Sequence, residues 1–519
     1  MALFTRPRRA AIISLDSTFT SLIIVTAATF LLRVPFWGRP LDADEGLYAY
    51  GGWQMLKGLV LYRDLYDLKP PGVYFLNALV FSLSSPEALN IFICAALVSC
   101  ATAMAVYLIA RSLWDGRTAL VAGLLFALFS SSLYIQGAGV NTEVFMLCPY
   151  MWAFYFMVRC LNGGSVRNAA LAGILLGCAT LFKQVAGAAL PVGVLALWFT
   201  AREQGSVRRL PVMLSMFVAG ALFPWAAALT YFGSHGAARD FLHWVVMYPF
   251  SYMSHARHIL NHAVALERVW WGLRGLLPLW VFGIVGTILI LLKARGHHGI
   301  LLVLFLAVSL AGALAGWNLF PHYFVQVVPA LALLSSHALV WAWRSTAARR
   351  SIPGAVGISA ALVAAVTFYA VQHYVAYRQP SDARLSSLEH TTTFMGFARF
   401  DLSRAAGLAL RERTSEKDTV FVWKDRAEVN FYALRKTPSR MPIAALPNTD
   451  ITGTVLEDVR REKPEYIVVF NALAIFRFDG LLDLLRRDYV RVAQIQGLPF
   501  PEQGIYRRKA DKGDGRQTR

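Results

Sequence analysis

The chain has 519 residues, of which 56% are hydrophobic and only 16% are charged. Soluble domains carry about 25% charged residues, so this composition argues against a cytosolic enzyme and indicates a membrane enzyme, channel or transporter. The formal net charge of +19 does not indicate nucleic-acid binding, because the basic residues flank apolar stretches at alternate ends, as topology determinants do.

A spanning helix needs about 20 mostly apolar residues. If the N-terminus is cytoplasmic, Arg and Lys fall in the inner loops and the short outer connections are nearly free of them, so the first long loop and the C-terminal segment are expected outside. The first span follows several arginines without a small-residue cleavage signal, so we expect it to remain as a signal anchor. The sequence predicts eleven spans, near residues 17–34, 87–110, 118–135, 143–160, 168–183, 185–200, 211–231, 274–292, 299–317, 321–343 and 353–373.

After about residue 380 the composition becomes that of a soluble domain. Helix patterns near 399–413, 454–462 and 481–487 alternate with strand patterns near 418–424, 465–471 and 489–495. This alternation predicts a small α/β domain outside the membrane. We therefore expect a transmembrane domain over 1–378 that includes an outer loop at 35–86, an α/β domain over 379–508, and a disordered tail over 509–519.

The first outer loop, residues 41–76, combines carboxylates, aromatic residues and one lysine directly beside a span. A carboxylate near the bilayer is costly unless it is hydrated, paired or functional. Partial burial would make Asp44 or Glu45 a stronger base, suited to removing a proton from a sugar or lipid hydroxyl. The alternative is structural, because Asp42 or Asp44 would cap a helix that begins near Gly46 equally well.

Two lysines are candidates for binding a phosphate. Lys69 stands between Asp67 and two prolines, which would keep the backbone stiff and the ammonium group presented. Lys183 interrupts two apolar stretches. Anchoring to lipid headgroups would explain Lys69 as well, and snorkelling to the interface would explain Lys183.

Two further segments place polar groups at the outer ends of spans. Asn141 and Glu143 precede an apolar helix, where a carboxylate meets the positive end of the helix dipole or acts as a cap. His322 and Tyr323 stand where a later span leaves the outer surface, and this pair would hydrogen-bond a phosphate or sugar. Interfacial tyrosines are more often simple belt residues.

A metal site is a weaker candidate. His255, His258 and His262 have the spacing i, i+3 and i+7, which places them on one face of a helix. Such a face would hold a metal ion, but no carboxylate is interleaved, so contact with the membrane interface is the favoured interpretation. All five cysteines fall in apolar stretches, which argues against a disulfide framework or a thiolate site.

Taken together, these segments resemble the membrane glycosyltransferases of the GT-C fold. The resemblance is to the branch with protein O-mannosyltransferases, the aminoarabinose transferases of lipid A and the Rgt-type transferases. It covers the order of the spans, the first outer loop and the outer C-terminal domain. The matching motifs are Asp44-Glu45-Gly-x-Tyr48, Asp67-x-Lys69-Pro70-Pro71, Asn141-x-Glu143, Lys183 and His322-Tyr323.

The resemblance implies an all-α polytopic bundle in the bacterial inner membrane that takes a sugar from polyprenyl phosphate. The acceptor would be a hydroxyl of a lipid, glycan or protein, and a single displacement would invert the anomeric carbon. Asp44 would be the general base, with Glu45 or Glu143 orienting the acceptor. The donor phosphate would be held by Lys69 and Lys183, with help from His322 and Tyr323. The sugar pocket would be lined by Tyr48, Trp53, Tyr62, Tyr66, Asp67 and Asn141.

Two departures from the family pattern stand out. In the aminoarabinose transferases an acidic residue that can help bind a metal directly precedes the loop lysine, whereas here Leu68 occupies that position. A divalent metal is therefore an open question, and no other cofactor is implied. Asn141 and Glu143 stand where relatives often have Asp, so the second acid departs from the family pattern.

Two other functions compete with transfer. A transporter or flippase for a polyprenyl-linked lipid would place its charged residues near the membrane midplane, in repeated halves. Here the acids gather in one outer loop, and no inverted repeat is detectable. A non-catalytic scaffold is the third interpretation, and the presence of Asp44, Lys69 and Lys183 argues against it.

Overall fold

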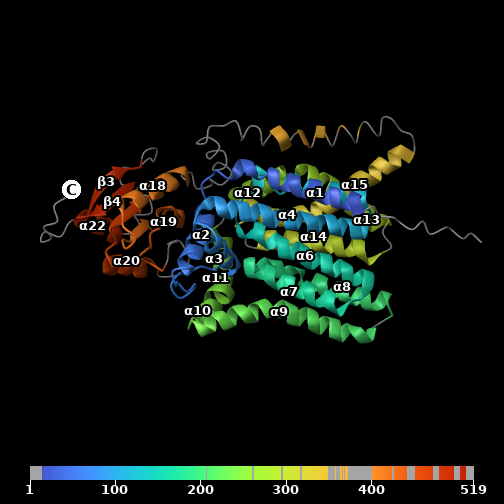
Figure 1. Cartoon of the computed structure of the whole chain (residues 1–519), viewed down its shortest axis with the longest axis horizontal. Coiled ribbons are helices and arrows are strands. Elements are labelled where there is room, and N and C mark those ends of the chain that lie inside the picture. The colour runs from blue at the N-terminus through green and yellow to red at the C-terminus, as the bar shows by residue number, and fades with distance from the viewer. Residues whose placement is uncertain are drawn as a thin grey trace, which may run out of the picture.

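The computed structural model describes residues 15–205, 207–259, 262–293, 296–315, 318–348, 400–423, 426–440, 451–470, 479–495 and 503–509, and some positions between 357 and 371. Long helices lie side by side in one bundle, and the C-terminal segment lies beyond one end of it (Figure 1). The bundle helices are α1 (Leu15–Leu31), α4 (Ala88–Leu113), α5 (Gly116–Phe129), α6 (Thr142–Gly163), α7 (Val166–Phe182), α8 (Leu190–Glu203), α9 (Leu210–Ser234), α13 (Leu277–Lys293), α14 (His297–Ala315) and α15 (Val328–Ala348).

Seven helical stretches in the described part of the chain are long and apolar enough to cross a membrane. A bent pair, α12 (His262–Gly275) with the following α13, would add an eighth, with 77° between its halves. The helices at two predicted spans, α5 and α7, are shorter than a full crossing requires. The predicted span at 353–373 lies largely outside the described residues, so the expected count of eleven is not confirmed.

Short helices gather at the end of the bundle that faces the C-terminal segment (Figure 1). This end is called the rim below. Its helices are α2 (Ala43–Met55), α3 (Gly72–Leu83), α10 (Ala238–Leu242), the π-helix η5 (His243–Met247), α11 (Tyr248–Ile259) and α12. Short 3₁₀ turns occur at η1 (Val34–Phe36), η2 (Leu133–Ile135), η3 (Gln184–Ala189), η4 (Val207–Arg209) and η6 (Pro321–Val327).

The C-terminal segment contains a four-stranded sheet of order β1-β2-β4-β3, in which β1 and β2 are parallel and the other pairs are antiparallel. The strands are β1 (Val420–Trp423), β2 (Tyr466–Val469), β3 (Tyr489–Gln494) and β4 (Gly504–Arg508). The helices are α18 (Phe400–Arg413), α19 (Ala427–Ala433), α20 (Ile451–Glu462) and α22 (Asp479–Asp488). The sequence patterns predicted three strands in this segment and did not reveal β4.

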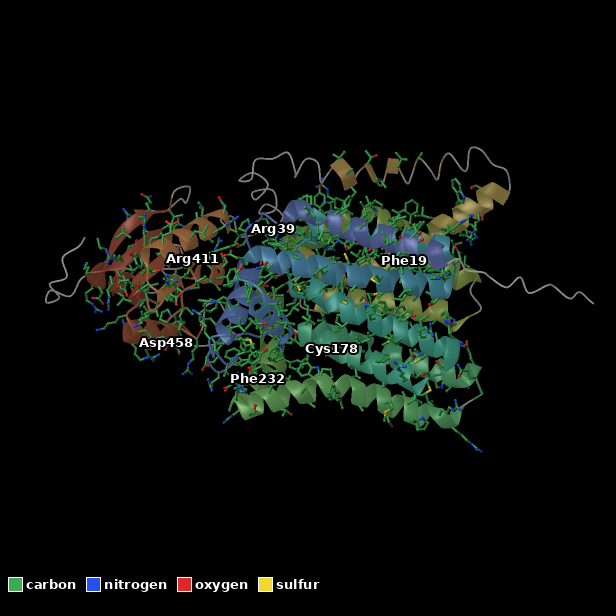
Figure 2. The ribbon with its side chains drawn as sticks, viewed as in Figure 1. Phe19, Arg39, Cys178, Phe232, Arg411 and Asp458 are labelled. Atoms are coloured by element: carbon green, nitrogen blue, oxygen red, sulfur yellow. The ribbon has the colours of Figure 1, made fainter. Side chains whose placement is uncertain are left out.

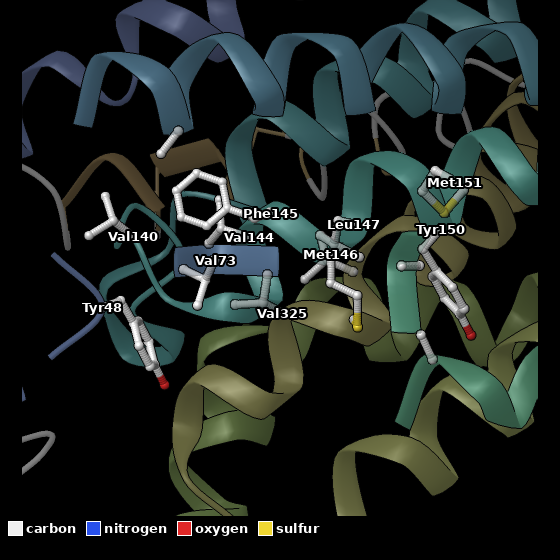
Figure 3. Packing of buried hydrophobic residues seen from close by; sticks show 14 of the residues in the cluster. Tyr48, Val73, Val140, Val144, Phe145, Met146, Leu147, Tyr150, Met151 and Val325 are labelled. Carbon is white, nitrogen blue, oxygen red and sulfur yellow. The ribbon is translucent and has the colours of Figure 1, made fainter. Parts of the chain in front are cut away.

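One continuous apolar core joins the bundle to the rim. Figure 3 shows the part of it where Tyr48 of α2, Val73 of α3, Phe145 of α6 and Val325 of η6 lie together. Burial of such side chains stabilises the fold by about 1.5–3 kcal/mol each. The rim helices are therefore fixed against the spans.

The C-terminal segment docks on the rim through helix α19. The main-chain N–H of Leu41 donates to the Tyr432 hydroxyl at 2.8 Å, and the Phe431 ring stacks on Phe81 of α3 with 5.6 Å between centroids. A weaker ion pair joins Arg411 of α18 to Glu87 at 3.7 Å. Figure 2 marks Arg411 in the C-terminal segment and Arg39 at the rim.

Candidate active site

At the N-terminus of α2, the carboxylate that caps the helix and the candidate base belong to different residues. Asp42 is the N-cap, and its carboxylate accepts the Glu45 N–H at 2.8 Å while Glu45 accepts the Asp42 N–H at 3.0 Å. This reciprocal arrangement is a capping box. Asp44 takes no part in it, and its side chain is 40% exposed. The sequence allowed either Asp42 or Asp44 as the cap, and in the structure the cap is Asp42.

Asp44 faces Lys69 across the rim. The Lys69 Nζ lies 3.8 Å from a carboxylate oxygen of Asp44, and the lysine side chain is only 14% exposed. Burial would lower the pKa of Lys69, but the negative charges of Asp44 and nearby Glu143 raise it above its ordinary value. The lysine is therefore a fixed cation at neutral pH.

A close helix contact brings Lys69 near the second lysine. Gly72, at the start of α3, packs against the end of α7, where an added β-carbon would lie 2.6 Å from the Leu181 carbonyl oxygen. Lys183 follows directly as the C-cap of α7. The absence of a side chain at Gly72 is what lets the two lysine-bearing segments approach.

Lys183 belongs to a group of buried polar side chains. It forms an ion pair with Glu143 in the first turn of α6, and its Nζ lies 3.5 Å above the centre of the Tyr323 ring. His322 Nε2 lies 3.8 Å from the same Glu143 carboxylate, while its Nδ1 contacts Gln136 at 3.1 Å. Together with Asp44 and Lys69, the four residues Glu143, Lys183, His322 and Tyr323 are called the polar cluster below.

Glu45 lies apart from the polar cluster and is fully buried. Its carboxylate forms an ion pair with Arg39 and accepts the Val140 N–H at 2.8 Å. Asn141 donates to Asp42 over a longer 3.4 Å. These contacts fasten the start of α2 to the loop that precedes α6. Sequence reasoning placed Glu45 in the chemistry, whereas its surroundings are those of a framework residue.

The predicted sugar-pocket residues divide into two groups. Trp53 and Tyr62 are buried in the core, Trp53 against Tyr50 and Tyr62 against Phe232 and Phe241. Aromatic rings bury large apolar areas when helices cover them, so both side chains contribute to the packing of the rim.

The other pocket candidates remain close to the rim. Tyr48 is buried with its ring edge on Tyr74, and Tyr74 donates to Asp67 at 2.7 Å. Burial raises the pKa of Asp67 above its ordinary value. Tyr66 stacks on Trp244 with 4.9 Å between centroids and accepts a hydrogen bond from Arg440 at 3.2 Å. Tyr66 therefore also connects to the C-terminal segment.

The metal candidates gain no support. The side chains of His255 and His258 lie outside the described residues, and His262 begins a separate helix, α12, with an exposed side chain. In the described part of the chain, no three His, Cys, Asp or Glu residues are grouped to hold a metal ion. Leu68 offers no ligand, and both oxygens of Asp67 are engaged, by Tyr74 and by the Leu68 N–H. Leu68 therefore supplies no ligand at the position where the resemblance raised a metal site.

Sequence reasoning missed several residues that surround the polar cluster. Arg39 pairs with Glu45, Gln136 contacts His322, and Asn318 donates to Tyr252 at 2.9 Å. Burial raises the pKa of Tyr252 on α11, and the charges of Lys69 and Asp44 also act on this pKa. Gln136 has a left-handed φ of 52°, which is uncommon for a residue other than glycine. Gln136 and Asn318 contact partners that are distant in the chain, so no local sequence pattern indicates them.

Comparison with known families identifies related proteins. A family model described as dolichyl-phosphate-mannose-protein mannosyltransferase matches residues 68–231. An undecaprenyl phosphate-alpha-4-amino-4-deoxy-L-arabinose arabinosyl transferase of Pseudomonas aeruginosa is 27% identical over 338 residues, which are 62% of this chain and 58% of that protein. The match thus spans less than two thirds of the relative.

Solved structures show the same architecture. ArnT from Cupriavidus metallidurans bound to undecaprenyl phosphate superposes with a TM-score of 0.63 at 16% identity, covering 95% of this chain and 98% of that one. The Archaeoglobus fulgidus oligosaccharyltransferase in its apo form gives a TM-score of 0.55 at 14% identity, covering 88% of this chain and 70% of that one. At these identities the likeness shows the fold, and the expected GT-C architecture is confirmed.

Proposed function

We propose that this chain, a membrane protein of the GT-C fold and of the aminoarabinose-transferase and protein-mannosyltransferase type, transfers a sugar from polyprenyl phosphate to an acceptor hydroxyl at the outer membrane surface. The observation that carries the proposal is the 3.8 Å approach of Asp44 to Lys69 at the rim. A base and a phosphate-binding cation side by side are what a single displacement at a glycosyl phosphate requires.

Asp44 acts as the general base. Its partly exposed carboxylate is the one in the polar cluster that an acceptor hydroxyl can reach. It takes the hydroxyl proton while the acceptor oxygen bonds to the anomeric carbon. The bond from that carbon to the phosphate oxygen breaks in the same step, and its electron pair leaves with the polyprenyl phosphate. This displacement inverts the anomeric carbon.

Lys69 and Lys183 hold the donor phosphate. A lysine is a compact point charge suited to phosphate, and both ammonium groups belong to one cluster. The charge that develops on the leaving phosphate is stabilised by cations already in place, so no reorganisation is needed during the reaction. His322 and Tyr323 complete the phosphate site from η6.

Glu143 and Glu45 position other groups in this proposal. Glu143 is nearly inaccessible, pairs with Lys183 and lies near His322. It therefore orients these two phosphate-binding groups and does not contact the acceptor. Glu45, locked to Arg39 and Val140, orients the helix that carries Asp44. Tyr48, Tyr66, Asp67 and Asn141 border the sugar site.

The proposed topology places the rim and the C-terminal segment outside the bacterial inner membrane. The arginine-bearing turn between α4 and α5 lies at the opposite end of the bundle (Figure 1), in keeping with a cytoplasmic N-terminus. The proposed division is a transmembrane domain over 1–378, an α/β domain over 379–508 and a tail over 509–519. The acceptor is a lipid, a glycan or a protein.

A transporter or flippase for a polyprenyl-linked lipid is not favoured. The related proteins are transferases, and the ionisable residues of the polar cluster gather at one end of the bundle. Transport would place them near the midplane, where both sides have access.

The test is mass spectrometry of the envelope glycans and glycolipids of a deletion strain, complemented with the wild-type protein or with Asp44→Asn. A sugar that disappears on deletion and returns with the wild-type protein alone identifies the transferred group. The Asp44→Asn protein must be present in the membrane at wild-type level. Full complementation by this variant would remove Asp44 from the role of base.

A further inference from the structure

The chain folds into a closed turn just before Lys69. The Tyr62 N–H donates to the Leu65 carbonyl at 2.8 Å, and the Asp64 N–H donates to the Val60 carbonyl at 2.9 Å. The Asp64 carboxylate accepts the Val60 N–H at 2.9 Å. These bonds make residues 60–65 a compact unit, called the tyrosine turn below.

Tyr62 has an unusual backbone conformation in this turn. Its φ is +69°, in the left-handed region that bulky side chains rarely adopt. Such a conformation costs about 1–3 kcal/mol and persists only where the surroundings enforce it. Among the described residues other than glycine, five have positive φ, and three of these, Tyr62, Gln136 and Leu319, belong to segments at the polar cluster.

The side chain of Tyr62 explains how the conformation is held. The ring is fully buried against Phe232 of α9 and Phe241 of α10, with centroids 5.1 and 5.5 Å away. Figure 2 marks Phe232 at the rim end of α9. The phenol hydroxyl donates to the main-chain carbonyl of Lys69 at 2.8 Å.

A second attachment fixes the same unit to the bundle. Arg63 pairs with Asp64 at 2.8 Å and donates to the His235 carbonyl, just after α9, at 3.1 Å. Beyond Lys69 the chain is tied by Gln184, which donates to the Leu68 carbonyl and to the Val245 carbonyl of η5, both at 3.1 Å. The main chain around Lys69 is thus held from both sides.

From this arrangement we propose that Tyr62 is a positioning residue for the donor phosphate. Its hydroxyl fixes the Lys69 main chain, so the packing of α9 and α10 sets where the Lys69 ammonium group lies. The inference rests on the proposed role of Lys69 as a phosphate ligand. This positioning role takes the place of the sugar-pocket role expected for Tyr62 from the sequence.

The experiment compares Tyr62→Phe with a matched control, Tyr489→Phe. Tyr489 is also buried, and its hydroxyl also donates to a main-chain carbonyl, that of Pro464, at 2.8 Å, but it lies in the C-terminal sheet. Both variants lose one buried hydrogen bond, so a similar loss of thermal stability is expected. Undecaprenyl phosphate is titrated into each purified full-length protein in nanodiscs.

We expect Tyr62→Phe to bind undecaprenyl phosphate about threefold to tenfold more weakly, and Tyr489→Phe to bind like the wild type. In a Lys69→Ala background, Tyr62→Phe should weaken binding no further, because its effect passes through Lys69. Wild-type affinity in Tyr62→Phe, or an equal further loss in the double variant, would overturn the proposal.

Hydrogen–deuterium exchange gives a second, independent measurement. Amides of residues 66–69 and of Gly72 should exchange faster in Tyr62→Phe than in the wild type or in Tyr489→Phe. Unchanged exchange would also refute the inference, even if Lys69→Ala is too weak a binder for the double comparison. Undiminished binding by Lys69→Ala is a distinct result, because it would reject the phosphate role of Lys69 and with it the premise.

Discussion

Gly46 of α2 lies directly against Glu428 of α19. A β-carbon at position 46 would lie 2.2 Å from the Glu428 Cβ and 2.5 Å from its Cα, which no real structure permits. Glu428 is fully buried and pairs with Arg426 at 3.4 Å. The helix that carries Asp44 and the C-terminal segment therefore fit together only because residue 46 has no side chain.

Gly46→Ala should loosen this docking. Helix α19 must shift, so we expect a lower melting temperature, faster proteolysis of the C-terminal segment and reduced sugar transfer. Gly38→Ala is the matched control, because an added β-carbon there meets nothing within 4 Å. Equal melting temperatures and equal proteolysis of the two variants would show that the contact does not matter.

Substitution of Asp42 should mainly affect stability, and substitution of Asp44 should mainly affect sugar transfer. Asp42→Ala removes the N-cap and should cost about 0.5–2 kcal/mol of stability. Asp44→Ala removes no capping bond and only the 3.8 Å ion pair with Lys69, so it should lower the melting temperature less than Asp42→Ala does, while transfer falls at least about 10²-fold. Thermal unfolding and transfer assays on the same membranes check both statements. The reverse pattern would make Asp44 the structural residue.

The buried pair of Glu143 and Lys183 should behave as a unit. Either Glu143→Gln or Lys183→Met leaves an unpaired charge in a buried site, which costs about 3–5 kcal/mol. The double variant removes both charges and should recover much of this stability, but transfer should stay lost because a phosphate ligand is missing. Melting temperatures that simply add across the two changes would contradict this coupling.

The contribution of Lys69 to donor binding should not depend on pH near neutrality. Because the pKa of Lys69 is raised, its charge is fully present below its ordinary pKa of about 10.4 and is lost only as the pH rises through the higher folded value. The difference in undecaprenyl phosphate affinity between the wild type and Lys69→Ala should stay constant from about pH 7.5 to about pH 9.5. A difference that shrinks within this range would show that the pKa is lowered instead.

The polar side chains of the first outer loop and of the later span ends could be identified from the sequence, because charges beside apolar stretches stand out. The structure brings Asp44, Lys69, Glu143, Lys183 and His322 into one cluster, as their common expected face implied. Their individual roles remain proposals. The sequence also contained the capping box, since its residues are three apart. It did not show whether the Glu45 side chain would take part in the helix cap or in the reaction.

What the sequence determined by itself was local: apolar length for the spans, charge bias for the expected orientation, and short motifs that place polar groups at the ends of helices. What only the tertiary structure decided was which distant groups meet, as with Glu45 and Val140, Tyr62 and Phe232, and Gly46 and Glu428. The physical reason is that hydropathy and capping depend on neighbours in the chain. Burial and pairing of a side chain depend instead on the packing of helices that are far apart in sequence.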